Sequence, residues 1–535
     1  MTRGSIFIAL LCMASACGPE PEPPSPCTLP AIDRGFTAIG RPYVDLLLVI
    51  DEGTSRAARE ALAAEIPRLL TELGSGRAPG GMVFAPVESI HVGVLSADLG
   101  GAGCDDDDAL LFDPVPCGEP GWLDFARRED DPEVAAGQVG CELRSVESEC
   151  SFGQPLEAAL KALTPSTSAT RFENGAAGHG DGANLGFLRE SSTLAVVILS
   201  QGDDCSAAEP GLFELESPDH PGALADRCLD HPEALHAVER FVEGLESLRP
   251  DGQLYVMPIV GVPLDLVPDP NLPLAEQMTE ALTDPRMQQR SDTVPVGCTS
   301  MLGTSSPPRR LVETAAALDG WQSFGLVGST CADDLSGSID TLIDAVGPGG
   351  WAGCFPRPYR REPDGRIGCA VYELLDPLEI ERCEELPGRT SAGIDESRAL
   401  LRCRVNQVAI GTDDEPLDPD AVGWVYDDFS DFVNRYCGDS PQRVAWVGTS
   451  PTERGLLIGS CNAGAFAPPP GVGESCAGPC ETPVETLEDF PLGLACDPAT
   501  ETCQPLCRDS WDCDAGWTCF DADGDGVPHC VTPSC

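Results

Sequence analysis

Four continuous apolar runs stand out along the first half of the chain. They cover residues 43–51, Ile90–Leu95, Leu194–Leu199 and Leu254–Val260. Runs of this length without polar alternation are typical of strands that are buried on both faces, as in a parallel sheet. A shorter run, Phe324–Val327, predicts one more strand of the same kind.

Segments with helical spacing separate these runs. Apolar residues recur three or four positions apart from Ala58 to Leu73, where Pro67 predicts a kink or a break and Gly74 a stop. The same spacing predicts helices over residues 155–163, 230–248, 311–318 and 335–346, the second of these opening with a capping-box-like pattern at Asp230. Strands that alternate with helices predict a doubly wound α/β domain with a mainly parallel sheet over residues 40–350.

Other stretches lack this alternation. Residues 100–150 and 166–190 are acidic or glycine-rich, and we expect long loops near the carboxyl edge of the sheet. Residues 351–460 form a less regular accessory region with strands expected at 405–410, 443–447 and 456–458. A Pro-Gly segment at 467–471 marks a boundary, and residues 461–535 contain ten cysteines, a density that predicts a small disulfide-rich module.

The first residues have the features of an export signal. Arg3 precedes an apolar run, and the small residues Ala14 to Ala16 precede Cys17, as in a bacterial lipobox whose cysteine is acylated. We therefore expect a signal peptide over residues 1–16, a lipid anchor on Cys17 and a proline-rich tether over residues 17–39. Ala14 stands where most lipoboxes have a larger aliphatic residue, so an ordinary signal peptide and a secreted product remain the alternative.

Composition narrows the classes of function. The formal charge is -54, which disfavours nucleic acid and anionic membrane surfaces as partners. The 26 cysteines favour an oxidising compartment. Lys161 is the one lysine of the chain, and no phosphate-binding loop, nucleophile elbow or paired histidine zinc motif occurs. These features point away from catalysis and toward an exported monomer that is attached to the cell envelope, at the outer membrane or cell surface.

Several short motifs resemble the von Willebrand factor type A domain, in the form carried by myxobacterial-type lipoproteins. They are the strand Val44–Ile50 followed by Asp51 and Ser55, the strand Leu194–Leu199, and four further stretches: Val92–Gly100, Phe187–Glu190, Asp203–Ser206 and Gly328–Asp334. The resemblance covers roughly residues 40–350. It implies the same doubly wound fold and a role in adhesion or protein binding.

The resemblance also implies a divalent cation at the carboxyl edge, held in the family by Asp-x-Ser-x-Ser, a threonine and a further aspartate. Asp51 and Ser55 match, Gly53 replaces the first serine, and Gln201 stands where the aspartate is expected, with Asp203 two positions on. The segment Gly153–Pro155 lacks the threonine. Asp51, Ser55 and Asp203 are thus candidate ligands of a degenerate site for Mg²⁺ or Ca²⁺. The alternative, which we favour, is that Asp51 caps the helix that follows it.

A second candidate cation site lies near the end of the chain. Asp521, Asp523 and Asp525, with Gly526 after them, match the start of a calcium loop, but Thr532 stands where the bidentate glutamate belongs. A plain acidic turn is the alternative. We expect a non-catalytic adhesion or protein-binding function toward an unknown protein or cell-surface ligand. The alternatives are a structural envelope protein and, with less support, a secreted hydrolase.

Overall fold

The computed structural model describes residues 37–39, most of 42–461, and the short strands at 494–497, 502–505, 518–520 and 529–531. Gaps in the main range fall at 52, 80–83, 101–103, 105–106, 112–116, 118–120, 147–149, 151, 191, 250–252, 270–273, 290–295, 319–322, 350–358, 360, 379, 396–397, 412–413, 415, 430–432, 434–441 and 453–455. Several predicted segments lie outside the described residues: the signal peptide, Cys17, the tether before residue 37 and the acidic loop Asp521–Asp525.

A mainly parallel sheet forms the centre of an α/β fold. Its strands follow the order β10-β6-β5-β2-β3-β4, and β9 also pairs with β6. All these pairings are parallel except that between β3 and β4. The bounds are β2 Tyr43–Ile50, β3 Ser89–Ser96, β4 Leu123–Ala126, β5 Thr193–Leu199, β6 Leu254–Val260, β9 Ser323–Gly325 and β10 Gly328–Ser329. The four long apolar runs are strands of this sheet, whereas of the predicted strand Phe324–Val327 only the first two residues belong to one, β9.

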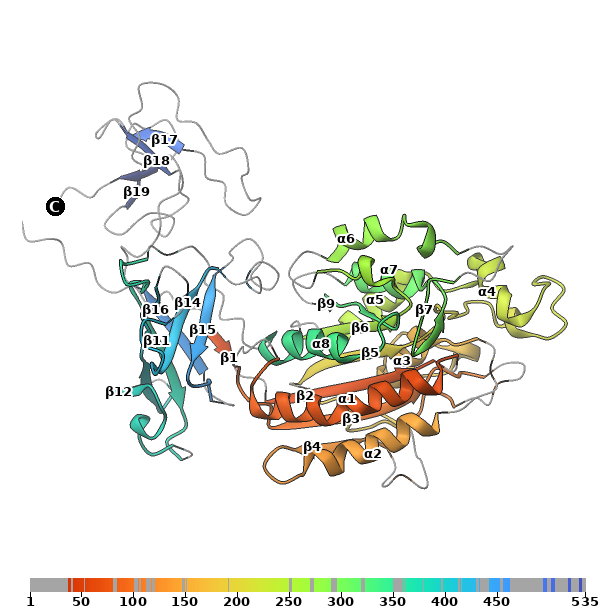
Figure 1. Cartoon of the computed structure of the whole chain (residues 1–535), viewed down its shortest axis with the longest axis horizontal. Helices are drawn as coiled ribbons and strands as arrows, with labels where there is room; N and C mark the ends of the chain where they lie inside the picture. Colours follow the sequence, from red (N-terminus) through yellow and green to blue (C-terminus); the bar gives the residue numbers. More distant parts are fainter. Residues whose placement is uncertain are drawn as a thin grey trace, which may run out of the picture. The chain divides into compact units, whose positions relative to one another are not determined.

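Both faces of the sheet are covered by helices, which explains why its long strands are largely apolar. Leu46, Leu48 and Ile50 of β2 pack in one core with α1, α2 and α8, whereas Leu47 and Val49 pack in a second core with α3, α5, α6 and α7. Figure 1 shows α1, α2 and α8 along one side of the sheet. The bounds are α1 Arg56–Ser75, α2 Pro132–Ser145, α3 Pro155–Leu163, α5 Val238–Ser247, α6 Leu274–Ala281, α7 Arg309–Ala317 and α8 Ser336–Gly349.

The first helix continues through Pro67, so the break that this proline allowed does not occur. Its last residue is Ser75, one position after the predicted stop at Gly74, and Gly76 is its C-cap. Gly76 has a φ of 70°, and its amide donates to the carbonyl groups of Glu72 and Leu73. This left-handed cap suits glycine, which has no Cβ to be strained there.

Two further predictions, of a loop over residues 100–150 and of a helix over residues 230–248, are wrong. Residues 100–150 contain β4 and α2, although the sequence predicts only loop. The core positions of α2 are mostly small residues, so its apolar periodicity is weak; Asp131 caps it and Pro132 is its first residue. Residues 230–248 are not one helix. A short α4 (Arg227–Asp230), a 3₁₀ turn (Pro232–Ala234) and α5 share this stretch, and Leu235 forms a bridge with Ala207.

Four strands of the accessory region form a second, five-stranded sheet with β1, in the order β1-β16-β11-β13-β12. Its bounds are β1 Thr37–Ile39, β11 Cys369–Leu375, β12 Arg389–Asp395, β13 Leu400–Val405 and β16 Leu456–Cys461, with a separate hairpin of β14 (Gly423–Asp427) and β15 (Arg443–Val447). Residues 37–39, expected to belong to the tether, are thus a strand that pairs with β16. A strand was expected at 405–410, but the observed strand β13 ends at Val405. Inside this region Arg389 pairs with Glu373 at 3.0 Å, and both side chains are buried.

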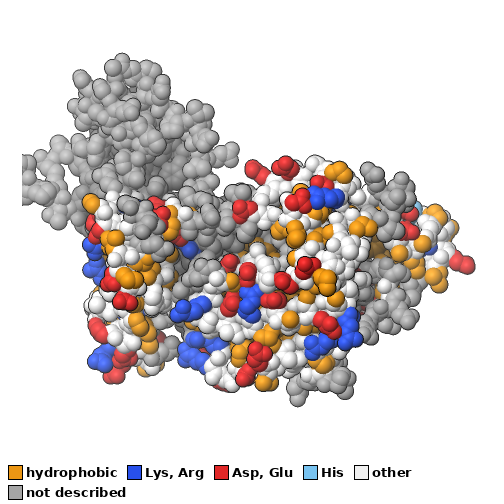
Figure 2. All heavy atoms as spheres, viewed as in Figure 1, with side chains coloured by type: hydrophobic (Ala, Val, Ile, Leu, Met, Phe, Trp, Pro, Cys, Tyr) orange, Lys and Arg blue, Asp and Glu red, His pale blue; other side chains and the backbone are white. Residues whose placement is uncertain are grey.

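Disulfides join several of the described loops. They include Cys104–Cys150, Cys117–Cys141, Cys205–Cys228, Cys298–Cys331 and Cys383–Cys403. Farther along the chain, β17 (Leu494–Asp497) pairs with β18 (Thr502–Pro505), and β19 (Thr518–Phe520) with β20 (His529–Val531). In the part of the chain that the structure describes, no helix is both long and apolar enough to cross a bilayer. Figure 2 shows acidic and basic side chains interspersed on the face that carries α1 and α8.

Candidate functional site at the carboxyl edge of the sheet

Asp51 follows β2 at the carboxyl edge and is only 4% exposed. Its amide donates to the carbonyl oxygen of Leu199, at the end of β5, over 3.1 Å. Its Oδ2 accepts a hydrogen bond from the hydroxyl of Ser200. Asp51 thus joins the ends of two neighbouring strands, β2 and β5.

Ser55, rather than Asp51, caps α1. Its Oγ accepts from the amide of Ala58 over 3.1 Å and donates to the carbonyl oxygen of Leu302. The amide of Ser55 donates to Oε1 of Gln201 at 2.8 Å, and Nε2 of Gln201 donates to the same Leu302 carbonyl at 2.9 Å. A side-chain hydroxyl and a side-chain amide therefore converge on one backbone oxygen from another part of the chain.

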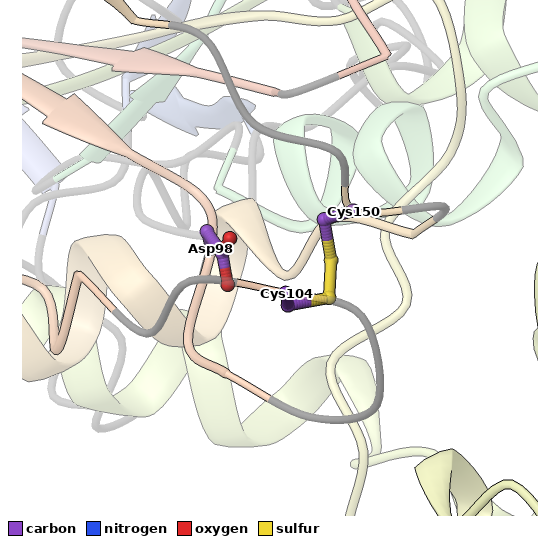
Figure 3. A group of neighbouring side chains, drawn as sticks. All are labelled: Asp98, Cys104 and Cys150. Atoms are coloured by element: carbon purple, nitrogen blue, oxygen red, sulfur yellow. A yellow bond between two sulfur atoms is a disulfide. The ribbon is translucent and has the colours of Figure 1, made fainter.

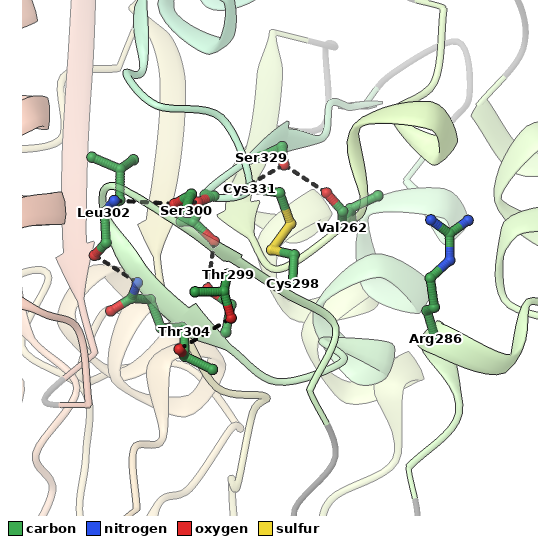
Figure 4. Close-up of a disulfide and its surroundings, with 12 residues drawn as sticks. Val262, Arg286, Cys298, Thr299, Ser300, Leu302, Thr304, Ser329 and Cys331 are labelled. Carbon is green, nitrogen blue, oxygen red and sulfur yellow. Dashed lines mark hydrogen bonds between the residues drawn. A yellow bond between two sulfur atoms is a disulfide. The ribbon is translucent and has the colours of Figure 1, made fainter.

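That oxygen belongs to a hairpin that the sequence did not predict. The hairpin pairs β7 (Cys298–Ser300) with β8 (Gly303–Ser305), and Leu302 lies in its turn. The disulfide Cys298–Cys331 ties it to the segment after β10, and Oγ of Ser300 donates to the carbonyl of Thr330 at 2.7 Å (Figure 4). Its strands are short and polar, so no apolar alternation marks them in the sequence.

Asp203 lies beside the start of α7. Its carboxylate accepts from the amides of Arg310 and Leu311 at 3.0 and 3.2 Å, and from Nε2 of Gln289 at 2.6 Å. Burial raises the pKa of this carboxyl to about 6, and hydrogen bonds from the backbone amides of Arg310 and Asp204 offset part of that effect. Asp203 therefore caps a helix.

Asp204 does the same for α3. It is 2% exposed and accepts from the amide of Leu156 at 3.1 Å, while the guanidinium of Arg310 lies at 3.1 Å. Oγ of Ser206 accepts from the next amide of α3, that of Glu157, also at 3.1 Å. The stretch Asp203–Ser206, which carried part of the resemblance, is thus a loop that caps two helices at once.

The expected cation ligands do not fit a bound ion in this arrangement. The Ser55 hydroxyl is engaged with the Ala58 amide and the Leu302 carbonyl, and Asp203 is held on the amides of α7. The Ala58 amide occupies one lone pair of the Ser55 hydroxyl, and both oxygens of Asp203 accept from protein donors, so this set has few free ligand atoms for the octahedral shell of Mg²⁺. Asp51 joins two strand ends, and Asp203 caps α7. Ser55 caps α1, the function that was predicted for Asp51.

One group of potential metal ligands occurs among the described residues. Asp98, Cys104 and Cys150 bring one ligand atom each within 4.8 Å of one another (Figure 3). Cys104 and Cys150 form a disulfide, however, and metal ions bind the thiolate. Asp98 accepts from the amide of Gly100 at 2.9 Å. In this oxidised state the group pins a loop.

A buried polar cluster lies beside α3 and was not predicted from the sequence. Glu157 accepts two hydrogen bonds from Arg240, at 2.7 and 2.9 Å, and Lys161 pairs with Asp108. Glu157 and Lys161 help to line a cavity of about 30 Å³, which is room for about one water molecule. The paired charges and the small volume favour a structural function. Lys161 is the one lysine, and its helical register with Glu157 was the available signal.

A second network braces the opposite edge of the sheet. Asp45, in the first half of β2, is fully buried and accepts from the amide and Nε of Arg189, each at 2.7 Å. Arg249 lies 3.6 Å from the same carboxylate. The stretch Phe187–Glu190 therefore holds the amino edge of the sheet together, and the signal in the sequence was Asp45, an aspartate in the interior of the apolar run 43–51.

Comparisons with known proteins add little to this geometry. No protein-family model and no curated protein matches the chain. Among solved structures, proximal thread matrix protein 1 from the mussel byssus aligns with 41% of this chain and 38% of its own, at 10% identity and a TM-score of 0.19. The chain thus spans well under half of that protein, and so low a score carries no argument about fold or function.

Proposed function

We propose that this chain is a non-catalytic binding or adhesion protein of the bacterial cell envelope, built on a von Willebrand type A-like domain. The observation that carries the proposal is the use of polar groups at the carboxyl edge. Asp51, Ser55, Asp203 and Asp204 all hold loops and helix ends in place. Such an edge suits a rigid surface for recognition, because its serine hydroxyls and carboxylates are engaged with one another and with backbone groups.

The compartment follows from the cysteines. Disulfides persist outside the reducing cytosol, and several join loops of the α/β domain. Together with Arg3, the apolar run and Cys17, they support an exported protein tethered by a lipid, with a secreted form as the alternative. A disulfide-rich module at 461–535 and weak calcium binding by Asp521, Asp523 and Asp525 belong to the same proposal.

A photo-crosslinking experiment tests the binding surface. Met301, in the turn of the β7–β8 hairpin, is 76% exposed, and Val134, on α2, is 73% exposed. A photoreactive residue replaces each in turn in the full chain, in intact cells. We expect discrete protein or glycan adducts from position 301 and none from position 134, which has matched exposure.

Two outcomes would count against this function. Adducts of equal yield from both positions would indicate non-specific contact, and the carboxyl edge would not be the binding surface. No adduct from either position would favour the second candidate, a structural envelope protein, which is supported by the same capping function of the candidate ligands. A secreted hydrolase has less support, since the sequence carries neither a nucleophile elbow nor a paired histidine zinc motif.

A further inference from the structure

The β7–β8 hairpin lies over three strand ends at once. Its Leu302 carbonyl accepts from Ser55 after β2 and from Gln201 after β5, and its Ser300 hydroxyl donates to Thr330 after β10. The amide of Ser306, just past the hairpin, also donates to the carbonyl of Gln201 at 2.8 Å. The hairpin therefore covers the point where these strands present their carboxyl ends.

The turn of the hairpin also packs into the core of the domain. The Leu302 side chain is 4% exposed and belongs to the core that contains α1 and α8. Gly303 has a φ of 130°, and a Cβ there would lie 2.7 Å from Nε2 of Gln201. The positive φ favours glycine, and a side chain at this position would displace the Gln201 amide from where it lies.

A disulfide also holds β7, the first strand of the hairpin. Cys298 and Cys331, with Cα atoms 5.6 Å apart, join β7 to the segment after β10 (Figure 4). Ser305 and Thr330 hydroxyls lie 2.8 Å apart, which adds a second link between the same two segments. Lifting the turn off Ser55 and Gln201 thus means moving a strand that is covalently held at its start.

We propose that this hairpin is an internal occupant of the carboxyl-edge site, which closes it to divalent cations. The Leu302 carbonyl fills the position between Ser55 and Gln201 that an incoming ligand would need, and the Gln201 amide takes over the bridging that a cation would supply. Binding at the exposed hairpin surface then does not depend on Mg²⁺. The site opens when the hairpin lifts, and the Cys298–Cys331 disulfide opposes that movement.

Hydrogen exchange on the full chain tests the closure without any partner, so its failure is distinguishable from failure of the proposed function. In the Cys298→Ser/Cys331→Ser variant, we expect exchange in peptides covering residues 53–58 and 296–306 to rise at least tenfold. The Cys117→Ser/Cys141→Ser variant, which removes a disulfide from α2, is the matched control. It should leave the same peptides within about twofold of wild type.

A second variant keeps the Cys298–Cys331 disulfide and removes the hydrogen bond from Gln201 to the Leu302 carbonyl. In Gln201→Glu one oxygen still accepts from the Ser55 amide, but the other faces the Leu302 carbonyl and repels it. We expect the same peptides to exchange faster, and millimolar Mg²⁺ to slow them again because a carboxylate now faces the site. In wild type, Mg²⁺ should change neither peptide.

Two results would overturn the proposal. One is unchanged exchange of residues 296–306 in both the double-cysteine and the Gln201→Glu variants, which would mean that neither the disulfide nor the amide holds the hairpin. The other is protection of residues 53–58 by Mg²⁺ in wild type that Ser55→Ala removes, which would mean that the cation reaches Ser55 with the hairpin in place.

Discussion

Single buried carboxylates in this protein differ in what surrounds them. Asp45, Asp203 and Asp204 each accept hydrogen bonds from amides or a guanidinium, which offset the cost of burial. Glu142 on α2 is 1% exposed, and the partner found for it is the Gln138 side chain at 3.4 Å. Burial therefore raises the pKa of Glu142 to about 7.

Replacing Glu142 with glutamine should stabilise the protein at alkaline pH. Below the unfolded pKa of about 4.5 the carboxyl is protonated in both states, and between that value and about 7 only the folded state holds the proton. Stability therefore falls as pH rises through this range, and the full cost is present above pH 7. We expect Glu142→Gln to gain on the order of 2 kcal/mol at pH 8 and little at pH 4.

Urea unfolding at the two pH values measures this gain. Glu133→Gln, at the exposed start of the same helix, is the control and should shift stability by at most a few tenths of a kcal/mol. Equal effects of Glu142→Gln at pH 4 and pH 8 would show that the carboxyl is not held protonated by burial.

For single residues, the sequence predicted where Asp51 and Ser55 lie but not which groups they hydrogen-bond. Asp51 and Ser55 do lie at the carboxyl edge, as a strand followed by a helix requires. Their partners come from Ser200 and Leu302, which are 149 and 247 residues away along the chain. Such contacts depend on how distant segments pack, so no local pattern could reveal that Ser55 donates to a carbonyl.

At the scale of elements, length and apolarity decided what could be predicted. Strands such as β5 and β6 are seven residues long and apolar throughout, and the helix α3 has the predicted bounds. The three-residue strands β7 and β8 contain cysteine, serine, threonine and glycine, and they form because tertiary contacts and a disulfide hold them. The hairpin that shapes the site was therefore the element least visible in the sequence.

The cap of α1 is a testable junction between helix and hairpin. Ser55→Ala removes the acceptor for the Ala58 amide and the donor to the Leu302 carbonyl. Loss of a serine cap costs about 1 kcal/mol, and weakening a buried carbonyl's hydrogen bonding adds to it, so we expect a loss of about 1–2 kcal/mol. Equilibrium unfolding in urea measures it.

Ser75→Ala at the other end of α1 is the control for this loss. Ser75 is exposed, and its hydroxyl donates to the carbonyl of Glu72 at 3.1 Å within the same helix. The control should cost less than about 0.5 kcal/mol. If both variants lose the same stability, the bond between Ser55 and the hairpin contributes nothing.

At the scale of the whole molecule, charge and cysteines describe the surroundings in which the fold works. A net charge of -54 disfavours phosphate-rich partners, and the disulfides of the α/β domain favour an oxidising compartment. Attachment through Cys17 would hold such an acidic protein at a membrane surface that would otherwise repel it. The anchor is thus the part of the proposal on which its location depends.

Substitution of Cys17 tests the anchor directly. In a bacterial host, the wild-type chain should incorporate labelled fatty acid and sediment with membranes, because buried acyl chains contribute about 0.8 kcal/mol per CH₂ and more than one chain holds a protein stably. Cys17→Ser should lose the label and move to the soluble exported fraction. Cys12→Ser, within the apolar run that we expect to be removed with the signal, is the matched control and should keep both properties. If wild type and Cys17→Ser both appear unlabelled and soluble, cleaved near Ala16, the lipobox interpretation is wrong and the protein is secreted by an ordinary signal peptide.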